Sequence, residues 1–200
     1  MSEEKTPNLL SEIDHCNTRS IRMLGMSDLT RLKDWRNAQI DVLRQSRFLT
    51  DEDQQRWWLS LAKDTTQILF GLYVDNPNPE LIGYGGLVYL NRENRRTEIS
   101  FLVAPERATD PVLYRYDLRA ALAMFARYAF NELGLNRIYT ETFAFRNRHI
   151  SILEEFGFKL EGRLRDHIYN NGRYCDSLMH SLLRSEWDVV RKEISFELAR

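Results

Sequence analysis

Cysteine is scarce in this 200-residue chain, which contains only Cys16 and Cys175. Cys16 sits in a polar N-terminal segment and Cys175 in a predicted strand, and neither context indicates a disulfide framework or a zinc site. We therefore expect free thiols, as in a reducing cytoplasm, and no bound metal.

Net charge is almost absent as well, since 28 Lys and Arg residues stand against 29 Asp and Glu residues, a balance of −1. No overall field would draw the chain to nucleic acid or to an anionic membrane, so we expect neither partner. Basic residues do gather at Arg92, Arg95 and Arg96. We interpret them as solvated turn charges, and a nucleic-acid or ribosome contact is the less favoured alternative.

The sequence has no long apolar run, and none approaches the length that crosses a bilayer. Its N-terminus, MSEEKTPNLL, lacks the basic-then-apolar order of a signal peptide. No internal repeat, low-complexity tract or Gly/Ser-rich linker divides it. These absences predict a cytoplasmic protein with a loose arm at 1–17, one domain at 18–187 and a C-terminal helical extension at 188–200.

Hydrophobic residues make up 43% of the chain and aromatic residues 12%, which is enough to bury a sizeable core. Alternation and turn signals predict strands at 20–24, 67–74, 81–90, 97–103, 136–143, 159–169 and 174–183. Helical periodicity and capping signals predict helices at 29–37, 54–63, 112–133, 149–155 and 185–198. This order indicates the α+β class, with a largely antiparallel, twisted sheet flanked by helices.

The segment 128–158 holds the most informative pattern. It contains YAF at 128–130, LNRI at 135–138, RN at 146–147 and FGF at 156–158 in one compact frame. A terminal hairpin follows, with EG at 161–162, RD at 165–166, Tyr174 and DS at 176–177. Together these residues resemble the acyl-CoA binding core of the GCN5-related N-acetyltransferases, in the branch that acetylates ribosomal-protein N-termini and nucleotide-linked amino sugars. The resemblance extends over about 18–187.

This resemblance implies a single GNAT-like domain that transfers an acetyl group from acetyl-CoA to a primary amine by direct attack. The implied cofactor-binding residues include Phe101, Leu102 and Val103, whose main-chain groups would bind the pantetheine arm like an added strand. The strand 136–142 would be the splayed neighbour. Without the resemblance, an ordinary buried strand would be the preferred interpretation.

Two carboxylates are the implied candidates for the base that deprotonates the acceptor ammonium. Glu98 stands at the start of the cofactor-binding strand, where related enzymes carry an acidic residue that faces the acceptor. Alternatively, Glu98 is an exposed carboxylate that pairs with Arg95 or Arg96. Glu141, on the neighbouring strand, is the second candidate.

The resemblance also places two residues near the thioester. Asn147 would hold pantetheine or the adjacent loop, and it has a local alternative as a helix N-cap. His149 is a candidate general acid or base, because its ordinary pKa is close to working pH, and a structural histidine is the alternative. Related enzymes often carry a tyrosine in this helix as the acid for the leaving thiolate. Leu153 and Glu154 occupy that region here, so no such tyrosine can be assigned.

One part of the family pattern is missing. The pyrophosphate loop of related enzymes has the form R/Q-x-x-G-x-G/A, whereas 106–117 reads ERATDPVLYRYD and contains no glycine. Side chains of Arg107, Tyr114 and Arg115 would then replace the loop amides as phosphate partners. Alternatively the chain has lost cofactor turnover and is a non-catalytic binding or regulatory module. Asp110 and Asp117 would repel a diphosphate that they faced.

The resemblance also implies a binding site for the acceptor amine, near the W-R-N sequence at 35–37 and a downstream arginine. By resemblance, Arg36, Asn37 and Arg44 would contact the acceptor, and helix packing with solvated polar neighbours is the alternative. The expected acceptor is a small-molecule amine such as a nucleotide-linked amino sugar, or a protein N-terminus. A homodimer is a further expectation, because an exposed final strand often pairs in such folds.

Overall fold

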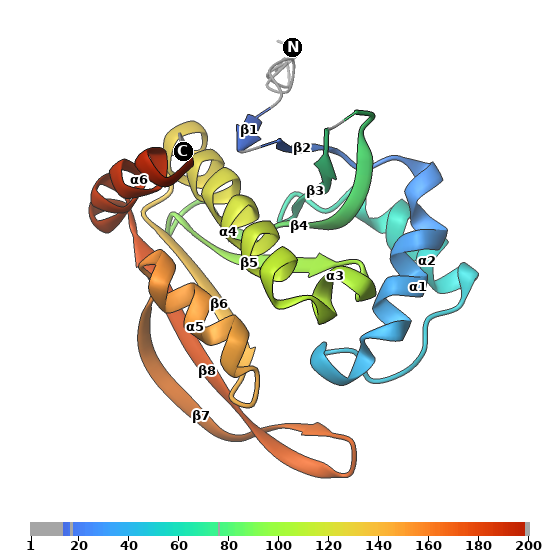
Figure 1. The fold of residues 1–200 in the computed structure, drawn as a ribbon. Helices are drawn as coiled ribbons and strands as arrows, with labels where there is room; N and C mark the ends of the chain where they lie inside the picture. Colours follow the sequence, from blue (N-terminus) through green and yellow to red (C-terminus); the bar gives the residue numbers. More distant parts are fainter. Residues whose placement is uncertain (1–13, 17, 76, 199–200) are drawn as a thin grey trace, which may run out of the picture.

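The computed structural model describes residues 14–16, 18–75 and 77–198 (Figure 1). These residues form one eight-stranded sheet in the order β1-β2-β3-β4-β5-β6-β8-β7. Within it β5 and β6 run parallel, and the other neighbouring pairs are antiparallel. The strands are β1 (Asp14–Cys16), β2 (Arg19–Met23), β3 (Ile68–Val74), β4 (Glu80–Asn91), β5 (Arg96–Val103), β6 (Arg137–Phe143), β7 (Lys159–Asn170) and β8 (Arg173–Leu183).

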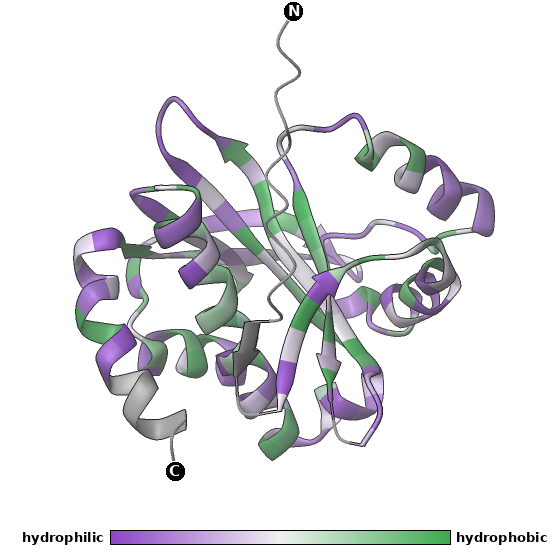
Figure 2. Ribbon diagram, turned by 90° about the horizontal axis from the view of Figure 1, so that it is seen from above, coloured by the Kyte–Doolittle hydropathy of each residue, from purple (hydrophilic) through white to green (hydrophobic). Residues whose placement is uncertain are grey.

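Helices cover both faces of this sheet (Figure 2). α1 (Leu29–Ala38) and α2 (Asp51–Leu61) lie on one face, and α4 (Pro111–Arg127), α5 (Asn147–Phe156) and α6 (Arg184–Leu198) lie on the other (Figure 1). A short helix, α3 (Pro105–Thr109), leads into α4. Three single turns complete the elements: η1 (Met26–Asp28), η2 (Ile40–Val42) and a π-helical turn, η3 (Tyr128–Glu132), at the end of α4. The α+β class predicted from the sequence is confirmed.

Two hydrophobic clusters hold the layers together, one on each face. The larger cluster joins α4, α5 and α6 to the sheet and includes Phe70, Leu118, Phe125, Phe130, Ile138 and Leu153. The smaller cluster joins α1 and α2 to the opposite face and includes Leu24, Leu32, Leu69, Tyr84 and Leu102. Burial at roughly 25 cal/mol for each Å² of apolar surface is the main favourable term for both.

Glycines in β4 allow it to approach β5 closely. A Cβ atom at Gly83 would lie 2.5 Å from the carbonyl oxygen of Leu102, and one at Gly85 would collide with that of Ser100. Real Cβ atoms do not tolerate such contacts, so the backbone of β5 would have to move. The glycines in this strand therefore set the position of the β5 main chain, from which the site described below is built.

The structure adds three details to the predicted elements. Asp14–Cys16, within the predicted arm, forms a short edge strand on β2, whereas 1–13 and 17 lie outside the described residues. α3 fills part of a segment that was expected to be a loop. The predicted helix 112–133 is α4 plus the π-helical turn, and it stops just before Gly134, whose φ is +64°.

The start of the C-terminal helix packs on the core, and the predicted boundary between the domain and an extension at 188–200 stays a prediction. α6 begins at Arg184, and the ring of Trp187, which is 4% exposed, stacks on Phe130 and Phe156. Residues 199–200 lie outside the description. Among the helices that the structure describes, none combines the length and the apolar character needed to cross a membrane.

Candidate active site

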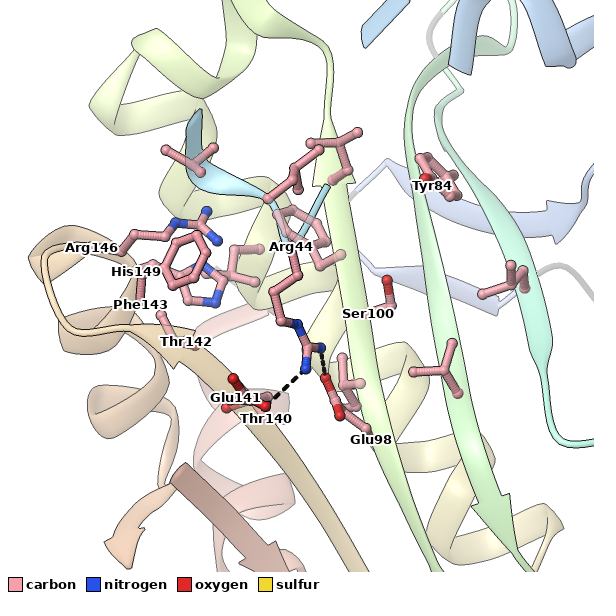
Figure 3. A pocket seen from close by; sticks show the side chains of 18 of the residues that line it. Arg44, Tyr84, Glu98, Ser100, Thr140, Glu141, Thr142, Phe143, Arg146 and His149 are labelled. Carbon is pink, nitrogen blue, oxygen red and sulfur yellow. Dashed lines mark hydrogen bonds and ion pairs between the residues drawn. The ribbon is translucent and has the colours of Figure 1, made fainter. Parts of the chain in front are cut away.

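The site begins where the two parallel strands separate. β5 and β6 pair at Arg96↔Arg137, Thr97↔Ile138 and Glu98↔Tyr139, and the pairing stops there. Each strand continues along its outer neighbour, β5 with β4 as far as Val103 and β6 with β8 as far as Phe143. The sheet is therefore split into two halves, and a cavity of about 360 Å³ opens at the split (Figure 3).

Two carboxylates face each other across the start of this split. Glu98 comes from β5 and Glu141 from β6, and the guanidinium of Arg44 lies between them (Figure 3). Arg44 donates through Nη1 to Glu141 Oε2 at 2.9 Å and through Nη2 to Glu98 Oε1. The alternative partners considered for Glu98 were Arg95 and Arg96, and the structure pairs it with Arg44 instead.

Burial sets the acidity of Glu98, which is only 4% exposed. Loss of hydration disfavours the ionised form and raises the pKa of Glu98, although the Arg44 charge acts in the opposite direction. A carboxylate with a raised pKa is a stronger base than an exposed one. Glu141 Oε1, also buried, accepts no hydrogen bond within the described part of the chain and lies 3.6 Å from His167 Nε2. Both carboxylates thus have capacity to accept a proton or a hydrogen bond.

A second polar group lines the same cavity. The imidazole of His149, at the first turn of α5, lines the cavity and is 8% exposed (Figure 3). Its Nδ1 lies 2.7 Å from the hydroxyl of Tyr114 on α4. Arg146 donates from Nη2 to the same hydroxyl at 2.9 Å. Burial first, then the charges of Arg146 and His180, hold the pKa of His149 well below its ordinary value, so the ring is neutral.

The edge expected to bind pantetheine has the geometry that this role needs. In β5, Phe101, Leu102 and Val103 pair with β4 on one side, and past Glu98 no described strand pairs with their other side. An extended ligand can therefore add to this edge by main-chain hydrogen bonds. One acceptor is taken, because the side chain of Gln39 donates to the carbonyl of Val103 at 2.8 Å. The residues present fit the pantetheine part of an acyl-CoA.

The segment expected to bind the diphosphate is arranged differently. Asp110 caps α4, and its carboxylate accepts hydrogen bonds from the amides of Val112 and Leu113 at 2.8 and 2.9 Å. Pro111, at the first helical position, has no N–H to offer. The amides that bind phosphate at such a helix N-terminus are therefore already satisfied by an internal carboxylate.

The three residues predicted as substitute phosphate partners all have other contacts. Arg107 forms a two-pronged ion pair with the buried carboxylate of Asp117, at 2.5 and 2.9 Å. Arg115 pairs with Glu155 on the protein surface, and the Tyr114 hydroxyl is bound to Arg146 and His149. Their role in binding the cofactor stays a prediction. Asp117 lies in the interior, where it also accepts from Arg19, and so does not face a ligand.

The predicted acceptor residues split into two groups. Arg36 and Arg44 line the cavity, and the Nε of Arg36 donates to Gln45 Oε1 at 3.0 Å. Asn37 instead anchors the loop that carries Arg44: its amide exchanges hydrogen bonds with the backbone of Leu49 at 2.8 and 2.9 Å and accepts one from Gln45 at 3.0 Å. Asn37 thus positions Arg44, and it is not among the residues that line the cavity.

Asn147 does not occupy the N-cap position that was its alternative role. The N-cap of α5 is Arg146, with φ −83° and ψ 55°, and Asn147 is the first residue inside the helix, without a capping bond. Its side chain is exposed and does not line the cavity. The N-cap interpretation is therefore wrong, and the cofactor role stays a prediction.

Sequence reasoning missed two residues of the site. Thr140 lines the cavity just past the separation point, is 4% exposed, and its hydroxyl has no partner within the described residues. Alternation along β6 places it on the same face as the buried Ile138, and a polar residue in such a position is the signal that could have identified it. Arg146 was noted only as part of a motif, and its contact with Tyr114 could not be inferred from spacing.

Other potential sites are sparse. In the ranges 14–16, 18–75 and 77–198, no group of three or more His, Cys, Asp or Glu side chains is arranged to hold a metal ion. Cys175 is buried with a free thiol, and the side chain of Cys16 is not among those described.

Comparison with known proteins identifies similar chains. The family model described as "Acetyltransferase (GNAT) domain" matches residues 21–179. YdaF of Bacillus subtilis, provisionally named a ribosomal N-acetyltransferase, is 32% identical over 131 residues, which are 66% of this chain and 67% of that protein. The spermidine N(1)-acetyltransferase of Vibrio cholerae is 28% identical over 114 residues, 57% of this chain and 63% of its own length.

Solved structures give the same result for the fold. Spermidine N-acetyltransferase from Vibrio cholerae, determined in complex with CoA and spermine, superposes with a TM-score of 0.76 at 23% identity, over 85% of this chain and 98% of that one. The family match covers most of the chain, and the split between β5 and β6 fits the acetyl-CoA that GNAT enzymes use as donor. The chain belongs to the GNAT family of N-acetyltransferases, enzymes that acetylate amines.

Proposed function

We propose that this chain transfers the acetyl group of acetyl-CoA to a primary amine of a small cationic molecule that binds at Glu98 and Glu141. One observation carries the proposal. Carboxylates from the two separating strands share the Arg44 guanidinium at the mouth of the split, and His167 Nε2 lies 3.6 Å from the Oε1 of Glu141. An acceptor ammonium has the same charge, and it can replace Arg44 there without leaving two buried carboxylates unpaired.

The residues of the chain divide the reaction between them. Acetyl-CoA, when bound, supplies an acyl group activated as a thioester. The β5 edge at 101–103 orients it, and the cavity walls exclude water from it. Glu98 takes a proton from the acceptor ammonium, directly or through water, and its raised pKa suits it to that transfer. The neutral amine then attacks the acyl carbon directly, without a covalent enzyme intermediate.

The choice of a cationic acceptor departs from the amino-sugar nucleotide and the protein N-terminus expected from the sequence. Those expectations treated Arg36, Asn37 and Arg44 as open contacts for the acceptor. Asn37 is bound to the backbone and Arg44 to two carboxylates, so this wall offers little free positive charge to a nucleotide. The similarity to a protein named spermidine N(1)-acetyltransferase also supports a cationic amine.

The test is thiol release from acetyl-CoA with spermidine, a nucleotide-linked amino sugar and an N-terminal peptide as acceptors. We expect turnover with spermidine, and we expect Glu98→Gln and Glu141→Gln each to lower its kcat/KM by tenfold or more, roughly the scale of general-base catalysis. Glu93→Gln, at an exposed position in the turn before β5, is the matched control. Turnover restricted to the nucleotide sugar or the peptide would overturn the cationic acceptor.

The alternative is a GNAT-like binding or regulatory module without turnover. It is favoured by the N-terminus of α4, whose amides are bound by Asp110, and by the pairing of Arg107 with Asp117. Isothermal titration with acetyl-CoA separates the two proposals. Micromolar binding supports the enzyme, whereas an absence of binding at millimolar cofactor favours the module.

A homodimer and a cytoplasmic location stay proposals. β7 is the outermost strand next to β8, and it exposes Leu160 and Tyr169 along its length. The outer edge of β7 pairs with no described strand, and such an edge offers main-chain groups to a second copy. Light scattering during size-exclusion chromatography, with Leu164→Lys as the disrupting variant, tests the dimer. A monomer at all concentrations would overturn it.

A further inference from the structure

Three side chains, from the first turn of α4, the N-cap of α5 and the first turn of α5, form a largely buried chain of hydrogen bonds that ends in the cavity. Arg146 contacts the Tyr114 hydroxyl, and that hydroxyl contacts Nδ1 of His149. Tyr114 is 6% exposed and His149 is 8% exposed, so their polar atoms depend on one another rather than on bulk water. Unsatisfied donors in such a place cost about 1–3 kcal/mol, and this cost decides where the protons are.

The direction of the chain follows from donor chemistry. A guanidinium can only donate, so the Tyr114 oxygen accepts from Arg146. The Tyr114 proton then needs an acceptor, and Nδ1 of His149 at 2.7 Å is the one that the structure provides. If Nδ1 carried the proton instead, the Tyr114 oxygen would receive two donors and its own O–H would have no acceptor among the described residues. A neutral ring that accepts at Nδ1 carries its proton on Nε2.

The protonated Nε2 lies on the side of the ring away from Tyr114, and His149 lines the cavity at the split (Figure 3). Thr140, the first residue of β6 past the separation point, places a buried, unpartnered hydroxyl in the same cavity. The part of α5 where related enzymes often carry a tyrosine has Leu153 and Glu154 here. The cavity therefore contains an N–H donor at His149 and an unpartnered hydroxyl at Thr140.

We propose that Arg146 and Tyr114 lock His149 as the Nε2–H tautomer, and that this N–H donates a hydrogen bond to the leaving sulfur of the acyl donor. The inference rests on the proposed function for the identity of the donor. Bond formation between the amine nitrogen and the acyl carbon breaks the carbon–sulfur bond, leaves its electron pair on sulfur, and releases one proton from the nitrogen to solvent as the amide forms. The Nε2–H stabilises that negative charge without giving up its proton, and the sulfur is protonated by solvent after release. His149 is thus a catalytic residue, and Tyr114 and Arg146 are positioning residues.

The first test reads the tautomer directly and needs neither cofactor nor turnover. The chain has 4 histidines, and two-bond ¹⁵N–¹H correlation of ¹⁵N-histidine-labelled protein resolves the protonation of each ring, with His149→Gln to assign the signal. We expect His149 to be Nε2-protonated and to keep a pKa well below its ordinary value. The groups that face this pair of side chains are Arg146, Arg148 and His180. An Nδ1–H tautomer would overturn the proposal.

Tyr114→Phe removes the hydroxyl and keeps the ring, so the chain of hydrogen bonds is cut with little change in packing. We expect the His149 signal to become a mixture of tautomers or to begin to titrate. Tyr116→Phe makes the same chemical change at an exposed position of the same helix and should leave the signal unchanged. An identical His149 signal in the Tyr114→Phe protein would contradict the lock.

The second test reads the charge on sulfur. In complexes with CoA, ultraviolet absorbance of the thiolate reports how readily the bound thiol loses its proton. We expect the thiolate to form at lower pH in the native protein than in His149→Gln, and kcat to fall about 10²-fold in that variant with little change in KM. Equal thiolate formation in both would overturn the role at sulfur. Because the tautomer is read without substrate, a failure of the proposed function would not be mistaken for a failure of the lock.

Discussion

At the scale of single residues, Arg44 acts on the acidity of Glu98. It bridges Glu98 and Glu141, and its favourable charge partly offsets the burial that raises the pKa of Glu98. Loss of hydration on burial lowers the pKa of Arg44. The charges of the two carboxylates raise it by more, so the pKa of Arg44 is raised overall. Arg44 and Glu98 are therefore electrostatically coupled.

Replacing Arg44 should move the pH dependence of catalysis in a defined direction. Arg44→Gln removes the influence that lowers the pKa of Glu98, so that pKa rises further and the ionised base is lost at a higher pH. We expect the acidic limb of the kcat/KM profile to shift to higher pH. Arg47→Gln, which alters an exposed arginine of the same loop, is the control. A profile with an unmoved acidic limb would show that Glu98 is not the base.

Glu161 provides a stability prediction at the same scale. Its pairing with Arg137, supported by the Ser181 hydroxyl, lowers the pKa of Glu161 to about 2. A depressed pKa contributes stability above the unfolded value near 4.5, and the contribution is lost as pH falls toward 2. Because the pair is partly exposed, Glu161→Gln should cost about 1 kcal/mol or less in urea unfolding at pH 7. The difference from the native protein should shrink at the lowest pH, and a constant difference would contradict the linkage.

At the scale of secondary-structure elements, the start of α4 departs most from the family pattern. Glycine-rich loops leave backbone amides open to phosphate, whereas here a carboxylate of the chain itself occupies them. The same residue ends α3 and begins α4, so this cap also fixes the angle between the two helices. Stability of the element and affinity for an anion are thus in competition at Asp110.

Asp110→Asn separates these two effects. The side-chain amide oxygen can still cap α4, but the negative charge near the positive end of the helix dipole is gone. We expect CoA to bind about 2- to 5-fold more tightly, which corresponds to about 0.3–1 kcal/mol. Pantetheine, which has no diphosphate, should bind equally to both proteins in calorimetry. An equal gain in affinity for CoA and for pantetheine would show that Asp110 does not act on the diphosphate.

The close approach of β4 to β5 yields another prediction for an element. Gly85→Ala forces a Cβ against the carbonyl of Ser100 and should push the backbone at Ser100–Phe101 out of place. We expect a loss of about 1–3 kcal/mol in urea unfolding, the usual cost of overpacking, together with weaker binding of CoA. Gly162→Ala, where a Cβ would meet nothing within 4 Å, is the matched control. Equal stability of the two variants would contradict this account of the glycines.

At the scale of the whole molecule, much of the fold could be predicted from the sequence. The contacts between the side chains of the site could not. Alternation and caps located the long strands and helices, and the capping box of Thr50 and Asp53 at α2 formed as its sequence indicates. β1 was missed because three residues carry no usable periodicity. Pattern also could not order the strands, and the bridge from Arg44 to Glu98 and Glu141 depends on that order. Local signals report local structure, whereas the site is assembled by long-range packing.

One long-range contact joins the two ends of the domain beside the cavity. In the β7–β8 turn, Asn170 donates to the Asp41 carbonyl at 2.8 Å and Asn171 donates to the Asp41 carboxylate at 2.9 Å. Asp41 belongs to the segment that carries Arg44. Asn171→Ala should therefore loosen this segment while the core stays intact. We expect activity to be lost at a temperature below the main unfolding transition, measured by circular dichroism. Loss of activity and of secondary structure at the same temperature would contradict a local role for this contact.

The same contact has a consequence for the order in which a nascent chain matures. The segment around Asp41 leaves the ribosome roughly 130 residues before the hairpin tip that holds it. Domains commonly begin to fold during synthesis from the N-terminal side, so the first half of this sheet can form while Arg44 still lacks its support. An acceptor-binding wall would then be among the last features to appear. Chains released before the hairpin emerges would lack both this support for Arg44 and the part of the core that β8 and α6 supply.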